Sequence, residues 1–108
     1  MTVKELSEKY SFEAVSMPCP DREIHGGYVG DLLSWVMGRA QADNAWITIM
    51  TNVNIAAVGA LSDVAVVIVA EGARPDEQVI STAEEKGVNI LLTNGTAYDT
   101  AVMISKDI

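Results

Sequence analysis

The sequence predicts an α/β domain of three layers (α/β/α), in which helices cover both faces of a mainly parallel central sheet. Two apolar runs carry this prediction: residues 64–70 contain only Val, Ile and Ala, and residues 88–93 form a second run around Asn89. Such runs, without alternation of polar and apolar residues, are typical of strands buried on both faces. Helical segments separate the predicted strands with short connections, as in parallel sheets with right-handed crossovers.

The N-terminal third is predicted to form one helix and two short strands. Thr2 and Glu5 have the spacing of a capping box, so a helix is expected to follow Thr2. Residues 12–16 alternate as in a strand, and two prolines place a loop after it. A second strand is predicted at residues 23–29, although the glycine pair within it weakens it.

The middle of the chain is predicted as helix, strand and helix. Asp31 is expected to be the N-cap of a helix over residues 32–39. This helix has apolar residues on nearly every side, so more than one of its faces must be covered. Residues 46–50 are predicted as a strand and residues 54–61 as a short helix rich in alanine.

Two further helices are predicted in the C-terminal half. Pro75 suits the first turn of a helix, and the two acidic residues that follow it favour the positive end of the helix dipole. This helix is expected to stop at Gly87, a left-handed cap residue. Thr96 is predicted to cap the closing helix, residues 97–104.

The composition predicts one domain over residues 1–108 and excludes several classes of partner. The chain has 7 Lys+Arg and 15 Asp+Glu, a net charge of −8, which disfavours binding to nucleic acid or to an anionic membrane surface. The longest apolar run is far shorter than the ~20 residues that span a bilayer. A single cysteine, Cys19, excludes an intramolecular disulfide, and the N-terminus has no signal-peptide core. We therefore expect a cytoplasmic protein.

Motifs that indicate catalysis or a bound metal are absent from the sequence. Neither the P-loop pattern (Gly-x-x-x-x-Gly-Lys-Ser/Thr) nor the Gly-x-Ser-x-Gly nucleophile motif occurs. The glycines of residues 26–30 lack the spacing of a dinucleotide-binding fingerprint, which favours a bulge or tight turn there. One histidine, His25, and one cysteine, Cys19, cannot form a usual zinc site. We predict no catalytic residue, no metal and no cofactor.

The carboxyl ends of three predicted strands favour a small-ligand site. In open parallel sheets ligands bind beyond these ends, where helix N-termini present free amides. Small and polar residues follow each of the strands, and each segment leads into a helix. The residues predicted to form the site are Thr51, Asn52, Asn54, Gly72, Thr93, Gly95 and Thr96. The alternative is that Asn54 and Thr96 only cap their helices.

Apolar residues in excess of what a small interior can bury predict a homodimer. No charged residue occurs between Ala45 and Leu61, and the helices at residues 32–39 and 54–61 are apolar on nearly all sides. Soluble monomers rarely expose apolar patches of more than a few hundred Å², and a twofold contact is the commonest way to cover one. The predicted interface residues are Leu33, Trp35, Met37, Ile55, Ala57, Val58 and Leu61.

Three segments resemble the DRTGG domain, a small regulatory module: residues 29–37 (VGDLLSWVM), 46–58 (WITIMTNVNIAAV) and 90–93 (ILLT). The likeness extends from about Thr2 to Ile104. It implies a dimerising, non-catalytic regulator, similar to the modules of CBS-containing pyrophosphatases and phosphate acetyltransferases and to the N-terminal half of HPr kinases. The acetyltransferase branch has a Gly-Asp-Arg-Ser/Thr-Asp stretch where this chain has residues 51–54, so a ligand contact by that arginine is not implied here.

Two functions are consistent with these observations. The first is a homodimeric regulatory module that binds a small anionic metabolite or an adenine nucleotide and acts on a partner enzyme. The alternative is an enzyme or a phosphotransfer-associated subunit, as the HPr kinase-like resemblance implies, without a P-loop of its own. The first is favoured because the sequence offers no nucleophile or base with a partner residue to activate it.

Overall fold

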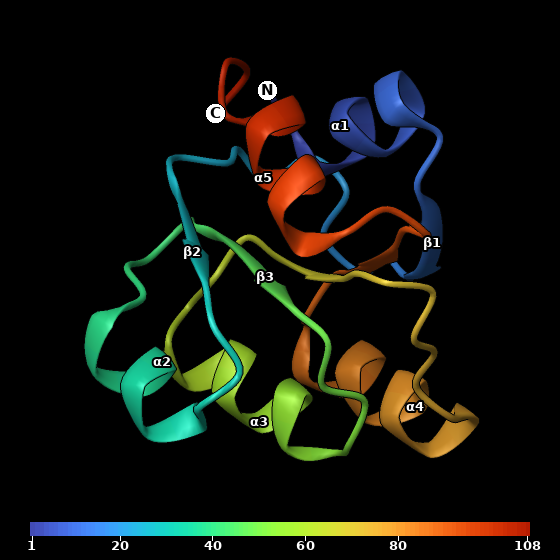
Figure 1. The fold of residues 1–108 in the computed structure, drawn as a ribbon. Coiled ribbons are helices and arrows are strands. Elements are labelled where there is room, and N and C mark those ends of the chain that lie inside the picture. The colour runs from blue at the N-terminus through green and yellow to red at the C-terminus, as the bar shows by residue number, and fades with distance from the viewer.

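The computed structural model describes residues 1–108, with five helices and five strands (Figure 1). In chain order the elements are α1 Val3–Tyr10, β1 Glu13–Ser16, β2 Gly27–Val29, α2 Leu33–Arg39, β3 Ala45–Thr48, α3 Asn54–Leu61, β4 Val66–Val69, α4 Glu77–Lys86, β5 Ile90–Leu92 and α5 Ala97–Ile104. The predicted α/β class is confirmed. No helix is long and apolar enough to cross a lipid bilayer.

The central sheet has the strand order β1-β5-β4-β3-β2. Strands β2 to β5 are parallel, and β1 runs antiparallel to β5 at one edge. The β4 strand lies between β3 and β5, and no residue from 64 to 70 is more than 3% exposed. This confirms the prediction of an interior parallel strand. The antiparallel pairing of β1 with β5 is not predicted by the sequence.

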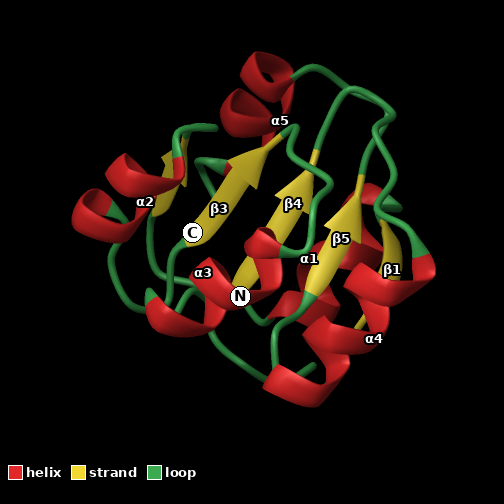
Figure 2. Ribbon diagram, turned by 90° about the horizontal axis from the view of Figure 1, so that it is seen from below, coloured by secondary structure: helices red, strands yellow, loops and turns green.

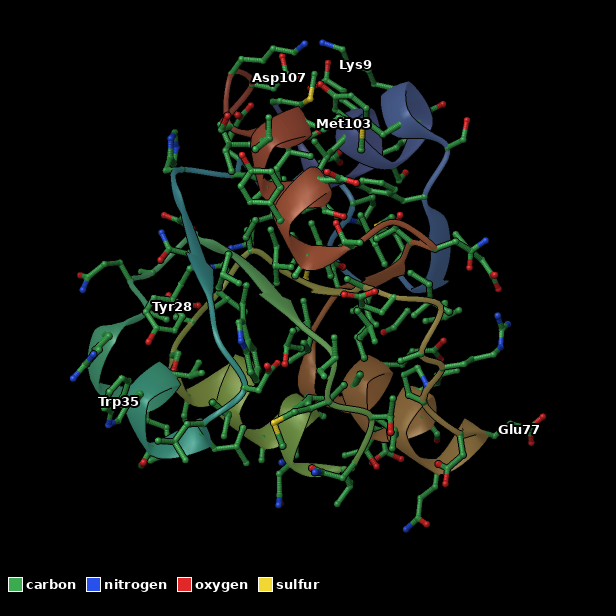
Figure 3. The ribbon with its side chains drawn as sticks, viewed as in Figure 1. Lys9, Tyr28, Trp35, Glu77, Met103 and Asp107 are labelled. Atoms are coloured by element: carbon green, nitrogen blue, oxygen red, sulfur yellow. The ribbon has the colours of Figure 1, made fainter.

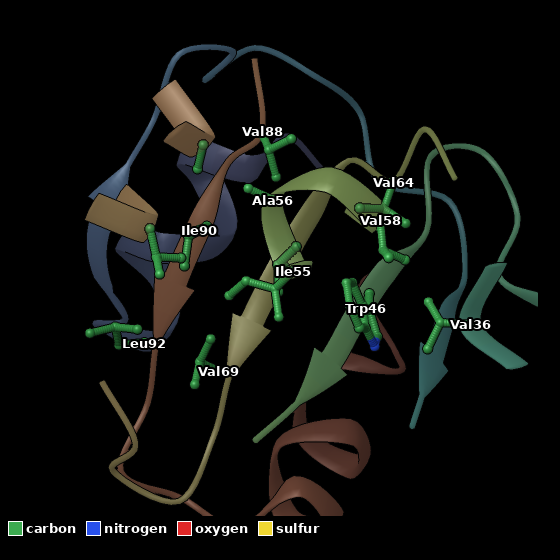
Figure 4. Packing of buried hydrophobic residues seen from close by; sticks show 13 residues of the cluster. Val36, Trp46, Ile55, Ala56, Val58, Val64, Val69, Val88, Ile90 and Leu92 are labelled. Atoms are coloured by element: carbon green, nitrogen blue, oxygen red, sulfur yellow. The ribbon is translucent and has the colours of Figure 1, made fainter. Parts of the chain in front are cut away.

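Helices cover both faces of the sheet and divide the core into two clusters. On one face α2, α3 and α4 pack against the strands, and on the other α1 and α5 do so (Figures 1 and 2). Trp46 belongs to the first cluster, where it is fully buried and its indole Nε1 donates to the Gly30 carbonyl at 2.9 Å. The first cluster, drawn in Figure 4, consists of Val36, Trp46, Ile55, Ala56, Val58, Val64, Val67, Val69, Val79, Ala83, Val88, Ile90 and Leu92.

The second cluster joins the sheet to the two terminal helices. It includes Leu6 of α1 and Ile104 of α5, both buried against the strands. At the surface above it, the single proton of the Tyr10 hydroxyl is shared between the Asp107 carboxylate and the Met103 carbonyl, the latter at 3.0 Å. Figure 3 shows Lys9 and Asp107 at this junction, where they form an ion pair of 3.0 Å. Hydrogen bonds from Tyr10 and Lys9 lower the pKa of Asp107 below its usual value.

Three predicted caps are confirmed, and one helix start and one strand are corrected. Thr2 and Glu5 form the capping box of α1, Gly87 ends α4 with a φ of 76°, and Thr96 caps α5. Pro75 is not in the first turn of α4, because Asp76 is the N-cap and its carboxylate accepts from the Val79 amide. The strand predicted at residues 23–29 is reduced to Gly27–Val29.

The prediction that Asp31 caps α2 is wrong. The N-cap of this helix is Leu32, which makes no side-chain hydrogen bond. The Asp31 carboxylate instead accepts from the Thr48 hydroxyl at 2.7 Å and from the Ile49 amide at 3.0 Å. Asp31 therefore ties the loop after β2 to the carboxyl end of β3, a tertiary contact that competes with local capping.

Replacing Asp31 with alanine is expected to lower the free energy of unfolding by about 1–3 kcal/mol, because the buried Thr48 hydroxyl loses its acceptor. Asp31→Asn keeps an acceptor oxygen and is expected to cost less. Urea unfolding followed by circular dichroism measures both values. Equal stability of Asp31→Ala and wild-type protein would show that these hydrogen bonds contribute nothing.

Candidate ligand-binding site

The carboxyl ends of β3, β4 and β5 lie at one edge of the sheet, as Figure 2 shows from the common direction of the three strands. A loop follows each strand there: residues 49–53, 70–76 and 93–96. Because β1 is antiparallel to β5, the start of β1 reaches the same edge, with Glu13 opposite Leu92. This edge therefore gathers residues from both ends of the chain.

A pocket of about 410 Å³ lies at this edge, beside β5. Three segments line it: the turn between α1 and β1, the loop after β4 and the loop after β5. Three of the predicted ligand residues, Gly72, Thr93 and Gly95, are among the lining residues. The full set is Tyr10, Ser11, Phe12, Glu13, Gly72, Ala73, Arg74, Leu92, Thr93, Asn94 and Gly95.

Backbone hydrogen bonds join the loops after β4 and β5. The Glu71 amide donates to the Gly95 carbonyl at 2.8 Å, and the Gly72 amide donates to the Thr93 carbonyl at 3.1 Å. Glu71 and Gly72 both have positive φ values, 65° and 72°, which turn the chain sharply after β4. The amides of Arg74 and Asn94, by contrast, make no hydrogen bond within the chain. The loops are thus fixed to each other while two of their donors stay available.

Arg74 supplies the positive charge of the pocket. Its Nη1 and Nη2 atoms donate to Oε1 and Oε2 of Glu13 at 2.9 and 2.6 Å. This contact lowers the pKa of Glu13 and raises that of Arg74. Both side chains are more than half exposed, 59% for Arg74 and 54% for Glu13, so solvent screens the ion pair.

The other four predicted ligand residues do not line the pocket. Thr51 and Asn52 lie in the loop after β3, Asn54 is the first residue of α3, and Thr96 is the N-cap of α5. The side chain of Asn52, rather than that of Asn54, supports the start of α3, since Asn52 Oδ1 accepts from the Asn54 amide at 2.9 Å. Thr96 accepts from the Asp99 amide, as an N-cap does.

Sequence reasoning missed eight of the eleven lining residues, among them Glu13, Arg74 and Asn94. Arg74 and Asn94 stand in the same loops as predicted residues, and both are polar residues beyond strand ends, so that signal was present in the sequence. Glu13 had no such signal. Its presence at this edge depends on the antiparallel pairing of β1 with β5.

The chain has no cluster of three or more His, Cys, Asp or Glu side chains that could hold a metal ion. The backbone of Cys19 is held by the side chain of Asn89. The Cys19 amide donates to Asn89 Oδ1 at 2.9 Å, and the Cys19 carbonyl accepts from Asn89 Nδ2 at 2.8 Å. Asn89 also donates to the Ala65 carbonyl, so it joins the proline-containing loop to the sheet.

A second pocket, of about 240 Å³, lies between β2 and α5. Its walls are mostly apolar, with Ile104 and Ile108 on one side and Val29 of the edge strand on another. It contains no charged side chain. No positively charged side chain in its lining would attract an anion.

Apolar side chains are exposed on α2 and at the end of α3. Trp35, Met37 and Leu61 are 52%, 53% and 74% exposed. Figure 3 shows Trp35 on the outer side of α2, where the Arg39 guanidinium stacks on its ring at 3.7 Å. Leu33 and Ala57 are partly exposed. We call Leu33, Trp35, Met37, Ala57 and Leu61 the α2–α3 patch.

Ile55 and Val58 cannot contribute to such a surface. Both are buried between α3 and the sheet, with exposures of 0% and 5%. Gly59 allows this close contact, because a Cβ atom there would lie 3.1 Å from Val88 and 3.3 Å from Val67. The predicted interface set of seven therefore has five members that can meet another molecule.

The fold and the pocket define a small three-layer α/β domain whose candidate site lies at the carboxyl edge of a parallel sheet. The sequence matches the DRTGG domain over residues 36–106, and the chain belongs to the DRTGG domain family. A comparison with curated proteins found no match.

The structure is similar to the crystal structure of the CBS and DRTGG domains of the regulatory region of Clostridium perfringens pyrophosphatase, which contains the activator diadenosine tetraphosphate. The TM-score is 0.77 at 15% sequence identity. The match covers 95% of this chain and 45% of that chain, so this chain spans less than half of the regulatory region.

Proposed function

We propose that this chain is a non-catalytic regulatory module that binds a small anionic metabolite, with an adenine nucleotide as the favoured class. The pocket beside β5 carries the proposal, because it brings the Arg74 guanidinium and the free amides of Arg74 and Asn94 to the carboxyl edge of the sheet. Its volume of about 410 Å³ lies within the range of small-molecule sites. The similar pyrophosphatase region contains an adenine nucleotide as its activator, which supports the choice of ligand class.

The lining residues favour an anion over a neutral ligand. A guanidinium group presents two parallel N–H donors that match the oxygens of a phosphate or carboxylate. The Thr93 hydroxyl and the Asn94 amide, in the loop after β5, add neutral donors. No second positively charged side chain lines the pocket, so one anionic group, rather than a chain of phosphates, is expected to be recognised there.

We infer further that the regulator is a homodimer and that it acts on a separate partner enzyme. The α2–α3 patch supports the first part: Trp and Met are enriched in protein interfaces, and the patch has exposed examples of both. With a net charge of −8, two copies repel each other except where an uncharged surface meets its equivalent. Within the uncharged residues 45–61, Ala57 and Leu61 reach the surface and belong to the α2–α3 patch.

A thermal-shift screen against nucleotides and phosphorylated metabolites tests the ligand proposal. A ligand at 100 times its Kd adds about 2.7 kcal/mol, which corresponds to a rise in Tm of roughly 10–20 °C for a domain of this size. Adenine nucleotides are expected to give the largest rise. Arg74→Gln is expected to weaken their binding about 10-fold to 100-fold, the loss of a charge-assisted hydrogen-bond pair.

Lys4→Gln is the matched control, since it removes one exposed positive charge that forms no ion pair, on a residue outside the pocket. It should leave affinity unchanged. Absence of any shift at millimolar ligand, or equal affinity of Arg74→Gln and wild-type protein, would contradict the proposal.

A further inference from the structure

The guanidinium group of Arg74 is already occupied by an anion of the chain itself. Both carboxylate oxygens of Glu13 accept from it, at 2.9 and 2.6 Å, in the parallel arrangement that a bound carboxylate or phosphate would use. Glu13 and Arg74 are 61 positions apart: Glu13 is the first residue of β1, and Arg74 lies in the loop after β4. Both line the same pocket. The contact therefore lies within the candidate site.

We propose that Glu13 is a built-in competitor for the ligand: its carboxylate holds Arg74 in the unliganded protein, and a phosphate group of the ligand displaces it. This inference rests on the proposed function, because it assumes that the pocket binds an anion. A phosphate monoester carries about −1.5 to −2 charges at pH 7 and presents three acceptor oxygens, against a single charge and two oxygens for Glu13. The ligand class is accordingly a phosphate monoester rather than a monocarboxylate.

The displacement requires only a side-chain movement. Strand β1 is held at its other end by Ser16, which is buried and whose hydroxyl donates to the Val88 carbonyl at 2.8 Å. The strand also pairs with β5 along Glu13–Ser16. The Glu13 side chain, by contrast, is more than half exposed and has no partner other than Arg74. It can rotate into solvent while the backbone of β1 stays paired.

The expected size of the competition follows from the exposure of the pair. Solvent-exposed ion pairs are weak, so Glu13 should reduce the affinity of a competing anion by a factor of about 2 to 5. A buried pair would have blocked the pocket. The exposed Glu13–Arg74 pair only raises the ligand concentration that is needed to displace Glu13.

Isothermal titration calorimetry with inorganic phosphate and with AMP tests this proposal on four proteins: wild type, Glu13→Gln, Glu8→Gln and Glu13→Gln/Arg74→Gln. Glu13→Gln is expected to bind both probes about 2 to 5 times more tightly than wild type. Glu8→Gln removes the same charge from an exposed position of α1 outside the pocket, and should bind as wild type does. The double variant should not bind more tightly than wild type, because the tighter binding of Glu13→Gln depends on Arg74.

The outcomes separate this proposal from the function on which it rests. If wild type binds AMP and Glu13→Gln binds it no more tightly, the competitor role is wrong and the ligand site stands. If Glu8→Gln shows the same gain as Glu13→Gln, the effect is one of net charge and the proposal is also wrong. If neither wild type nor Glu13→Gln binds either probe at millimolar concentration, both the site and the competitor are refuted.

Discussion

Replacing Trp46 with alanine is expected to lower the free energy of unfolding by about 3–5 kcal/mol, the usual cost of removing a buried aromatic side chain. Trp46 is a fully buried member of the first core cluster, and its indole N–H donates to the Gly30 carbonyl. Small domains have about 5–15 kcal/mol of stability in total. The substitution therefore removes a large part of what holds α2 and α3 on the sheet.

If the alanine variant does not fold, the free energy of unfolding can be measured on Trp46→Phe instead. It retains an aromatic ring but leaves the Gly30 carbonyl without its donor, at a cost of about 1–3 kcal/mol. Tyr98→Ala is the control, because Tyr98 is an aromatic residue of α5 that is 77% exposed. It should change stability by less than about 0.5 kcal/mol. If denaturant unfolding showed that Tyr98→Ala loses as much free energy of unfolding as Trp46→Ala, the burial of Trp46 would not explain its contribution to stability.

Leu61→Glu and Ala57→Glu are expected to convert a dimer of twice 11.5 kDa into a monomer. At a twofold interface each substitution places two carboxylates in an apolar contact, and an unpaired buried charge costs about 3–5 kcal/mol. The dissociation constant should rise about 100-fold or more. Ile55→Glu is not a useful test of the interface, because Ile55 is buried in the core of the chain itself.

Light scattering at tens of micromolar protein measures this effect. Tyr98→Glu serves as the control, since it adds the same charge to an exposed residue of α5, on the opposite side of the sheet from α2 and α3 (Figure 1). It should leave the mass unchanged. A wild-type protein that is monomeric under these conditions, or a mass that falls as much with Tyr98→Glu, would exclude the α2–α3 patch as the dimer contact.

The parts of the fold that follow from local sequence could be predicted, and the parts that depend on distant pairing could not. The run at residues 64–70 is apolar throughout, so its burial on both faces is evident without a structure. Asp31 illustrates the opposite case. Its position before an apolar segment is typical of an N-cap, but the Thr48 hydroxyl and Ile49 amide, brought near by β3, take its carboxylate.

The candidate site divides in the same way. Gly72, Thr93 and Gly95 were predicted because parallel strands place their carboxyl ends at one edge. Asn52 in the loop after β3 and Asn54 at the start of α3 were predicted by the same argument, but the pocket lies towards β1 and does not reach them. The position of the pocket depends on the order of the strands in the sheet, with β1 next to β5. The sequence pattern does not indicate that order.

The burial of α3 also required the structure. This helix is apolar on nearly every side, so its sequence does not indicate which side faces the sheet. The close approach at Gly59 selects one side, and Ile55 and Val58 go inward with it. Ala57 and Leu61 remain outside. The apolar excess that suggested a dimer is therefore smaller than the sequence alone implies, and is concentrated in the α2–α3 patch.

The most direct test of the ligand site is an NMR titration of uniformly ¹⁵N-labelled protein with AMP. The account predicts saturable chemical-shift changes concentrated at the amides of Gly72, Arg74, Asn94 and Gly95, with smaller changes at Glu13 across the pocket. The amides of Arg74 and Asn94 should move most, because they have no acceptor in the unliganded chain. Changes confined to the apolar pocket between β2 and α5, or no saturable change at millimolar AMP, would contradict a ligand site at the carboxyl edge of the sheet.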